Sequence, residues 1–149
     1  LDAKRDWGHA KDYVYMQWLM LQQEKPDDFV IASGKMKSVR EFIELSAIEL
    51  GWNIEKGGKG IIWEKSGLDE IGIRSDTGEV VVRIDPRYFR PTEVEQLVGD
   101  ASKAREELNW KSNISLDELI AEMIQEDLSE AKKEFLLKNQ GFSVYGPKE

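Results

Sequence analysis

The N-terminal third of the chain contains a segment whose apolar residues predict a buried helix. Between residues 10 and 23 the apolar positions are spread almost all round the helical wheel, a pattern typical of a helix that is covered on every side. Pro26 and the two Asp residues after it end this helix. Residues 29–32 then form an uninterrupted apolar run, which predicts a strand near 28–32 of the kind found inside parallel sheets.

The middle of the chain combines one clear helix with several short strands. Ser38 and Glu41 have the spacing of a capping box, so a helix is expected to begin directly after Ser38 and to end at Gly51. The glycine-rich stretch 51–79 predicts only short strands near 52–55 and 60–64, with a turn at 76–78. The β-branched run at 80–84 predicts one more strand.

Proline and asparagine mark two short helices in the next segment. Pro91 suits the first position of a helix that ends at Gly99. Asp100 can cap a second helix that runs through Leu108. Asn109 then stands where the chain must adopt the left-handed conformation, which Asn tolerates second only to Gly.

A second capping box, formed by Ser115 and Glu118, predicts the last helix. Its apolar stripe comprises residues 116, 119, 120, 123, 124 and 128, with a continuation at 131 and 135. The five tryptophans are expected to lie in the core: Trp7, Trp18, Trp52, Trp63 and Trp110. The tail from Gly141 looks loose. We therefore expect a single α/β domain over residues 1–149, with more helix than strand.

Charge and composition exclude several classes of function. The 21 Lys and Arg residues against 29 Asp and Glu residues give a formal charge of −8, which repels phosphate backbones and argues against nucleic-acid binding. The chain has no Cys and a single His, His9, so disulfides, thiol catalysis and an imidazole metal cluster within one chain are excluded. No apolar run has the length of a membrane helix.

The absence of Cys fits a reducing, cytoplasmic compartment, and a chain that begins with Leu1 suggests a fragment or a processed product.

The sequence also lacks the common catalytic and cofactor motifs. No glycine-rich turn with dinucleotide-binding spacing follows a strand, and there is no P-loop, no Tyr-x-x-x-Lys pair and no nucleophile elbow. His9, at the start of the first helix, more often satisfies backbone groups in such a position than it performs chemistry. Paired carboxylates such as Glu106 and Glu107 fall on polar helix faces and favour a solvated surface.

Arg5 is the first candidate binding residue. It precedes the apolar helix at 10–23 by a few residues, so its guanidinium could reach an anion held near the N-terminal amides of that helix. An ion pair with Asp6 or Asp12 at the surface explains the same pattern equally well.

Arg90 and Glu93 are the other two candidates. With Pro91 as the first helical residue, Arg90 would stand at the N-cap and Glu93 in the first turn. A guanidinium there could bind a diphosphate in a forked manner, and the carboxylate could accept both hydroxyls of a ribose. The alternative is structural, with Glu93 favouring the helix dipole and Arg90 pairing with it.

Several stretches of the chain together resemble the C-terminal part of the GDP-mannose 4,6-dehydratases, which belong to the extended short-chain dehydrogenase/reductase group. The most specific stretch is Asp-Pro-Arg-Tyr-Phe-Arg-Pro-Thr-Glu-Val at 85–94. The Arg-Asp-Trp-Gly-His stretch at 5–9 and the Leu-Asn-Trp at 108–110 resemble features shared more widely with nucleotide-sugar epimerases and dehydratases. The match at 5–9 continues to residue 14, and the most specific stretch lies within a match at 82–94. Further stretches match at 28–32, 38–42 and 99–104. The resemblance covers nearly the whole chain.

This resemblance implies roles for the three candidates. Arg5 and Arg90 would hold the diphosphate of GDP-mannose, and Glu93 would bind the nucleoside ribose. The complete enzyme oxidises C4 of the sugar with bound NADP, eliminates water across C5–C6 and returns the hydride to C6, giving GDP-4-keto-6-deoxymannose. Its catalytic residues lie on an N-terminal NADP-binding Rossmann domain, and this chain has no counterpart of them.

The resemblance therefore implies a substrate-binding portion that binds no cofactor and is inactive alone, taken from a cytoplasmic enzyme that forms homo-oligomers. Residues 10–32 would normally pack against the missing Rossmann domain, and in isolation they should expose apolar surface. Two departures are visible: Ser112 replaces the usual Pro after the Leu-x-Trp motif, and the stretch 56–79 matches poorly. A non-catalytic nucleotide-sugar-binding module and a plain interaction domain are the alternatives.

Overall fold

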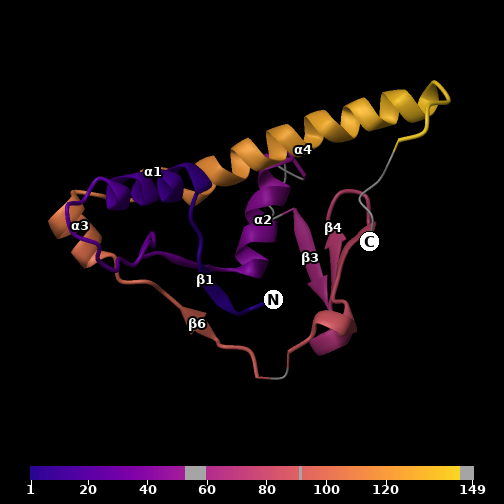
Figure 1. Ribbon diagram of the computed structural model, residues 1–149. Helices are drawn as coiled ribbons and strands as arrows, with labels where there is room; N and C mark the ends of the chain where they lie inside the picture. Colours follow the sequence, from indigo (N-terminus) through magenta and orange to yellow (C-terminus); the bar gives the residue numbers. More distant parts are fainter. Residues whose placement is uncertain (53–59, 91, 145–149) are drawn as a thin grey trace.

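The chain folds into four α-helices and two small β-sheets, described by a computed structural model over residues 1–52, 60–90 and 92–144 (Figure 1). The strands are β1 (Lys4–Asp6), β2 (Met36–Ser38), β3 (Ile61–Glu64), β4 (Ile71–Arg74), β5 (Val80–Arg83) and β6 (Gln96–Leu97). The helices are α1 (Ala10–Leu21), α2 (Val39–Glu49), α3 (Ser102–Leu108) and α4 (Leu116–Asn139), with 3-10 turns η2 (Gly67–Asp69) and η3 (Pro86–Tyr88). The predicted α/β class is confirmed.

The first sheet joins three segments that are far apart in the sequence. Strand β1 lies in its centre, antiparallel to β2 and parallel to β6. These strands have only two or three residues each, so none of them produces a periodic signal in the sequence. The sheet therefore depends on long-range pairing, and it is this pairing that brings the regions around residues 5 and 95 together.

The second sheet is an antiparallel meander in the order β3-β4-β5. Strands β3 and β5 confirm the predictions at 60–64 and 80–84, whereas β4 was not predicted. The expected turn lies between β4 and β5, where Gly78 has a positive φ of 77°. Of the strand predicted near 52–55, residue 52 lies in a turn and the others fall outside the described residues.

The strand predicted at 28–32 is wrong. This segment forms neither helix nor strand and joins neither sheet, and its backbone finds no strand partner among the described residues. Its side chains explain the apolar pattern: Ala32 is buried in the main core, and Phe29 and Ile31 pack against that core. Val30 points outward and is 51% exposed.

Both predicted capping boxes are confirmed, and each sets the start of its helix. The Ser38 side chain accepts from Glu41 N while the Glu41 carboxylate accepts from Ser38 N, and Ser115 and Glu118 form the same reciprocal pair at α4. Asn109 ends α3 in the left-handed conformation, with a φ of 51°. Local chemistry therefore determines these three helix ends.

The helix predicted from Pro91 to Gly99 is also wrong. Residue 91 lies outside the described residues, and the segment from 92 onward forms a turn followed by β6. Lys4 N donates to Glu95 O, and β6 pairs with β1, so the sheet uses the backbone groups that a helix would need. Consequently Arg90 is not a helix N-cap, and Glu93 does not lie in a first helical turn.

The main core lies where α1 and α3 meet the segment at 29–32. Its buried residues are Met16, Ala32, Ala101, Ala104, Leu108 and Trp110. Trp110 is 2% exposed, as expected, but Trp18 is 53% exposed, so the expectation of a core position is wrong for Trp18.

Helix α1 is not covered on every side, contrary to the prediction from its apolar pattern. Only Asp12 and Met16 of this helix are buried. Val14, Tyr15, Trp18 and Leu21 are 51–82% exposed, and Tyr15 stacks on Trp18 with ring centroids 5.9 Å apart. The apolar residues of α1 that do not enter the core thus form an exposed surface. Exposed apolar surface in this region was expected for a substrate-binding part in isolation.

The capping box of α2 leads to a pH prediction. A hydrogen bond from Lys37 Nζ, with a second from Ser38 N, lowers the pKa of Glu41 to about 2 from its ordinary 4.5. A lowered folded-state pKa gives stability that is fully present above about pH 4.5 and is lost as the pH falls through about 2. We expect the free energy of unfolding to fall more in this window for the wild type than for Glu41→Gln, by urea denaturation. Parallel pH profiles would contradict this.

Candidate functional site

Arg5 occupies the centre of the first sheet and is fixed there by three acceptors. Its Nη1 donates to Lys4 O at 2.8 Å and to Val94 O at 2.9 Å, and its Nη2 donates to the Glu93 carboxylate at 2.5 Å. The pairing of β1 with β6 carries Glu93 to this position. The structure therefore brings together two of the three predicted site residues, although they are 88 positions apart in the sequence.

Asp6, the next residue, ties the end of β1 to two loops. One carboxylate oxygen accepts from the amide and the hydroxyl of Ser33, and the other accepts from Gly34 N at 2.8 Å and Gly99 N at 3.4 Å. Asp6 is thus occupied by loop groups and does not pair with Arg5, so the surface ion pair considered for Arg5 does not form. Its role is to hold the backbone around the site.

A shallow hollow lies beside Arg5. Its lining includes Arg5, Tyr13, Ala32, Leu97, Val98 and Gly99. Leu97 and Val98 are more than half exposed and give the hollow an apolar rim. Its charged lining residues are Arg5 and Asp6, and the Asp6 carboxylate already accepts from the loop amides of Gly34 and Gly99. Such a surface suits a ligand that combines an anionic group with an apolar or aromatic one.

Tyr13 is a lining residue that the sequence did not single out. Burial, together with the nearby negative charges of Asp6 and Asp12, raises the pKa of Tyr13, so it remains a neutral phenol at physiological pH. Its ring lies so close to Gly8 that a Cβ there would be 2.2 Å from Tyr13 Oη. Gly8 is therefore required by the close approach of this ring.

Gly99 closes the other side of the hollow, and its environment gives a second prediction. A Cβ on Gly99 would lie 2.3 Å from the Cβ of Ala32. Gly99→Ala should therefore lower the free energy of unfolding by about 1–3 kcal/mol. Combined with Ala32→Gly, it should cost less than the two single changes added together, by at least about 1 kcal/mol. Urea denaturation of the four proteins tests this, and strict additivity would show that the two sites do not touch.

Arg90 stands apart from this arrangement. It is exposed and makes no hydrogen bond or ion pair with the residues that the structure describes. Its neighbour Arg87, by contrast, is held by Asp85, which also accepts from Arg87 N. The Arg90 guanidinium is thus unconstrained by the described part of the chain.

The described residues offer neither a metal-binding cluster nor a membrane-spanning helix. These residues contain no cluster of three or more His, Asp or Glu side chains that could hold a metal ion. Among them, no helix has both the length and the apolar character needed to cross a bilayer. His9 caps α1 by accepting from Lys11 N, as the backbone-satisfying interpretation predicted.

Comparison with known proteins assigns the chain to a family. The family model described as GDP-mannose 4,6 dehydratase matches residues 1–123. The chain belongs to this family. A GDP-mannose 4,6-dehydratase of Yersinia enterocolitica is 55% identical over 147 residues, which cover 97% of this chain and 40% of that protein. The human GDP-mannose 4,6 dehydratase is 52% identical over 86% of this chain and 32% of its own length. The resemblance inferred from the sequence is confirmed.

Solved structures support the fold. RMD from Pseudomonas aeruginosa, solved with NADPH, matches with a TM-score of 0.56 and 17% identity, over 83% of this chain and 32% of that one. The Bordetella bronchiseptica enzyme WbmG, solved with NAD and UDP, matches with a TM-score of 0.53 and 21% identity, over 80% of this chain and 30% of its own. The chain spans about 40% of the length of the Yersinia dehydratase.

Proposed function

We propose that this chain is the C-terminal, substrate-binding portion of a GDP-mannose 4,6-dehydratase and that it binds the nucleotide sugar at Arg5, Arg90 and Glu93. Family membership over residues 1–123 supports this proposal. In the complete enzyme the reaction would convert GDP-mannose to GDP-4-keto-6-deoxymannose with NADP. The chain alone is expected to bind no NADP and to show no turnover.

The observation that carries the proposal is the state of the Arg5 guanidinium. A guanidinium has five N–H donors, and three of them are used by Lys4 O, Val94 O and Glu93. The other two donors have no acceptor among the described residues and are available to a ligand. Because the three acceptors fix the orientation of the group, an incoming phosphate oxygen would meet a preorganised partner.

Glu93 would then have two roles. It restrains Arg5, and its carboxylate is an acceptor for ribose hydroxyls at a position next to the diphosphate. Its side chain is 40% exposed while that of Arg5 is 28% exposed, so a ligand can reach both. Arg90, exposed and unconstrained, would close over the diphosphate from the segment that leads to Glu93.

We further propose that the exposed face of α1 and the segment at 28–32 pack against an NADP-binding domain. The face presents Val14, Tyr15, Trp18 and Leu21. The segment at 28–32, which shares the core with α1, has the composition of a buried parallel strand but no strand partner among the described residues. A neighbouring sheet would bury the face and supply the missing hydrogen bonds. The greater length of the dehydratase relatives is consistent with such a domain.

Calorimetric titration of the chain with GDP, guanosine and inorganic diphosphate tests the proposed binding. We expect GDP to bind more tightly than guanosine by roughly tenfold or more, since charge-assisted hydrogen bonds contribute about 1.5–3 kcal/mol each. Diphosphate alone should bind weakly and should compete with GDP. Equal binding of GDP and guanosine, or no binding of either by the folded chain, would favour the alternative of a plain interaction domain.

A further inference from the structure

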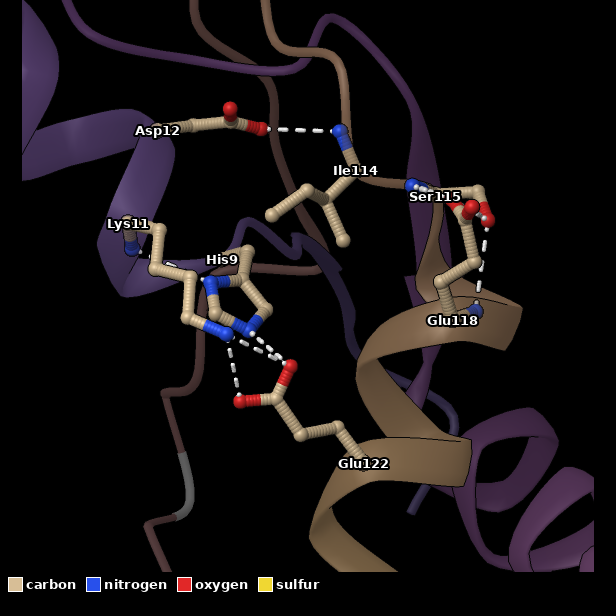
Figure 2. Close-up of polar contacts among 7 residues, drawn as sticks. All are labelled: His9, Lys11, Asp12, Ile114, Ser115, Glu118 and Glu122. Carbon is tan, nitrogen blue, oxygen red and sulfur yellow. Dashed lines mark hydrogen bonds and ion pairs between the residues drawn. The ribbon is translucent and has the colours of Figure 1, made fainter.

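The single histidine of the chain links two helices through both of its ring nitrogens. Figure 2 shows His9 at the start of α1, with Nδ1 accepting from Lys11 N at 3.0 Å and Nε2 facing Glu122 of α4 at 3.3 Å. His9 is 6% exposed. It therefore caps one helix and contacts the other from a site that is almost closed to water.

This geometry requires one particular protonation state. A neutral imidazole has one donor nitrogen and one acceptor nitrogen. Because Nδ1 accepts the Lys11 amide hydrogen, the ring hydrogen must be on Nε2, where it points to the Glu122 carboxylate. A second proton could only go to Nδ1, and Nδ1 would then face the Lys11 N–H as another donor. The protonated ring cannot keep the cap of α1.

Whether the contacts of His9 with α1 and α4 survive protonation of its ring depends on the charged groups nearby. On α1, Asp12 already accepts from Ser112 Oγ and from the amides of Asn113 and Ile114, so it is committed to the loop before α4. On α4, Glu118 is committed to the capping box at Ser115.

Lys11 and Glu122 are the charged residues that form a hydrogen bond or ion pair with His9 itself, within the described part of the chain. Lys11 Nζ binds both Glu122 oxygens, at 2.9 and 3.0 Å, which lowers the pKa of Glu122 and keeps it ionised. Glu122 thus attracts an imidazolium more strongly than a neutral ring. The contact between α1 and α4 survives protonation while the α1 cap does not.

We propose that His9 is a pH-responsive clamp: in its neutral form it caps α1 and contacts α4 together, and its protonation releases the first turn of α1 while α4 stays attached. The released turn lies between Arg5 and Tyr13, so the clamp controls the order of the helix that forms one side of the hollow. The inference does not depend on the nucleotide proposal, because it needs no ligand.

The test uses the isotope-labelled chain and two variants that separate capping from titration. Asn accepts the same backbone hydrogen bond at an N-cap but does not titrate, so His9→Asn keeps the cap at every pH. His9→Ala removes the cap at every pH. Nitrogen NMR of the one histidine reports its tautomer, and hydrogen exchange of the Lys11 and Asp12 amides, divided by the intrinsic rate at each pH, reports the opening of the first turn.

In the wild type we expect the Nε2–H tautomer while the ring is neutral, and corrected exchange that becomes roughly three- to tenfold faster once nitrogen NMR shows the ring to be protonated, the size of a lost N-cap. Over the same pH series His9→Asn should show slow exchange throughout and His9→Ala fast exchange throughout, with the α4 amides near Glu122 unchanged. The proposal is overturned if the wild type shows the Nδ1–H tautomer or pH-independent exchange. It is overturned equally if His9→Asn keeps the wild-type pH response, since another group would then be titrating.

Discussion

Replacing Asp12 by Ala is expected to lower the free energy of unfolding by about 2–4 kcal/mol. Asp12 is 7% exposed, and one carboxylate oxygen accepts from Ser112 Oγ at 3.1 Å and from Asn113 N and Ile114 N at 2.9 Å each. Figure 2 shows the last of these bonds crossing from α1 to the chain that leads into α4. The change would leave two backbone donors without their charged acceptor and loosen the start of α4.

Two control variants separate the stability that the buried Asp12 carboxylate provides from the effect of removing any negative charge. Asp12→Asn keeps the shape and one acceptor oxygen, so it should cost clearly less than Asp12→Ala. Glu126→Ala removes an exposed carboxylate from α4 and should change stability by no more than about 0.5 kcal/mol. Urea denaturation followed by tryptophan fluorescence measures all three. An Asp12→Ala protein as stable as Glu126→Ala would show that the link between α1 and α4 contributes nothing.

The second large effect concerns Arg90 in the complete enzyme. If its guanidinium binds the diphosphate, Arg90→Ala should weaken GDP-mannose binding roughly tenfold to a hundredfold. Arg90→Lys should recover only part of this loss, because an ammonium group cannot make a forked contact. Arg87→Ala is the matched control, since Arg87 is already held by Asp85 and should bind nearly as wild type. Titration calorimetry with circular dichroism as a fold check measures these effects, and wild-type binding by folded Arg90→Ala would exclude the role.

Local signals in the sequence predict the parts of the fold that local chemistry determines. The starts of α2 and α4 follow from Ser38 and Ser115 with their Glu partners, and the end of α3 follows from Asn109. At α2 and α4 a side chain within three residues satisfies backbone groups that the helix leaves open. At α3 the left-handed conformation of Asn109 lets its own backbone N–H donate to Ala104 O. Strands β3 and β5 were similarly visible in their β-branched and apolar runs.

The errors arise where distant segments compete for the same backbone. The segment after Pro91 has a reasonable helical start, but pairing with β1 stabilises it as β6 instead. The segment at 28–32 has the composition of a buried strand, yet the described residues offer it no neighbouring strand. The apolar pattern of α1 overestimates its burial for the same reason. In the segment at 28–32 and in α1, the apolar sequence predicts more burial than this chain provides by itself.

The sequence allows candidate site residues to be selected, but it does not give their geometry. Arg5 and Glu93 were selected from the sequence, but their direct ion pair depends on the pairing of β1 with β6 and could not be read from their spacing. Tyr13 and Gly99 were missed because a Tyr in an apolar helix and a Gly before a helix have many explanations. The need for glycine at positions 8 and 99 becomes visible only in the folded structure, where a Cβ would collide with Tyr13 or Ala32 respectively.

An NMR titration of the labelled chain with GDP-mannose is the most direct test of nucleotide-sugar binding at Arg5, Arg90 and Glu93. We predict that the largest shifts will occur at the Arg5 Nε–H, at residues 97–99 and at Arg90, and that Glu93→Gln will reduce them. A second hollow of about 280 Å³, lined in part by Trp7, Lys35 and Asn113, serves as an internal comparison. Shifts confined to that second hollow, or the absence of any shift at Arg5 when GDP-mannose saturates the chain, would contradict the proposed site.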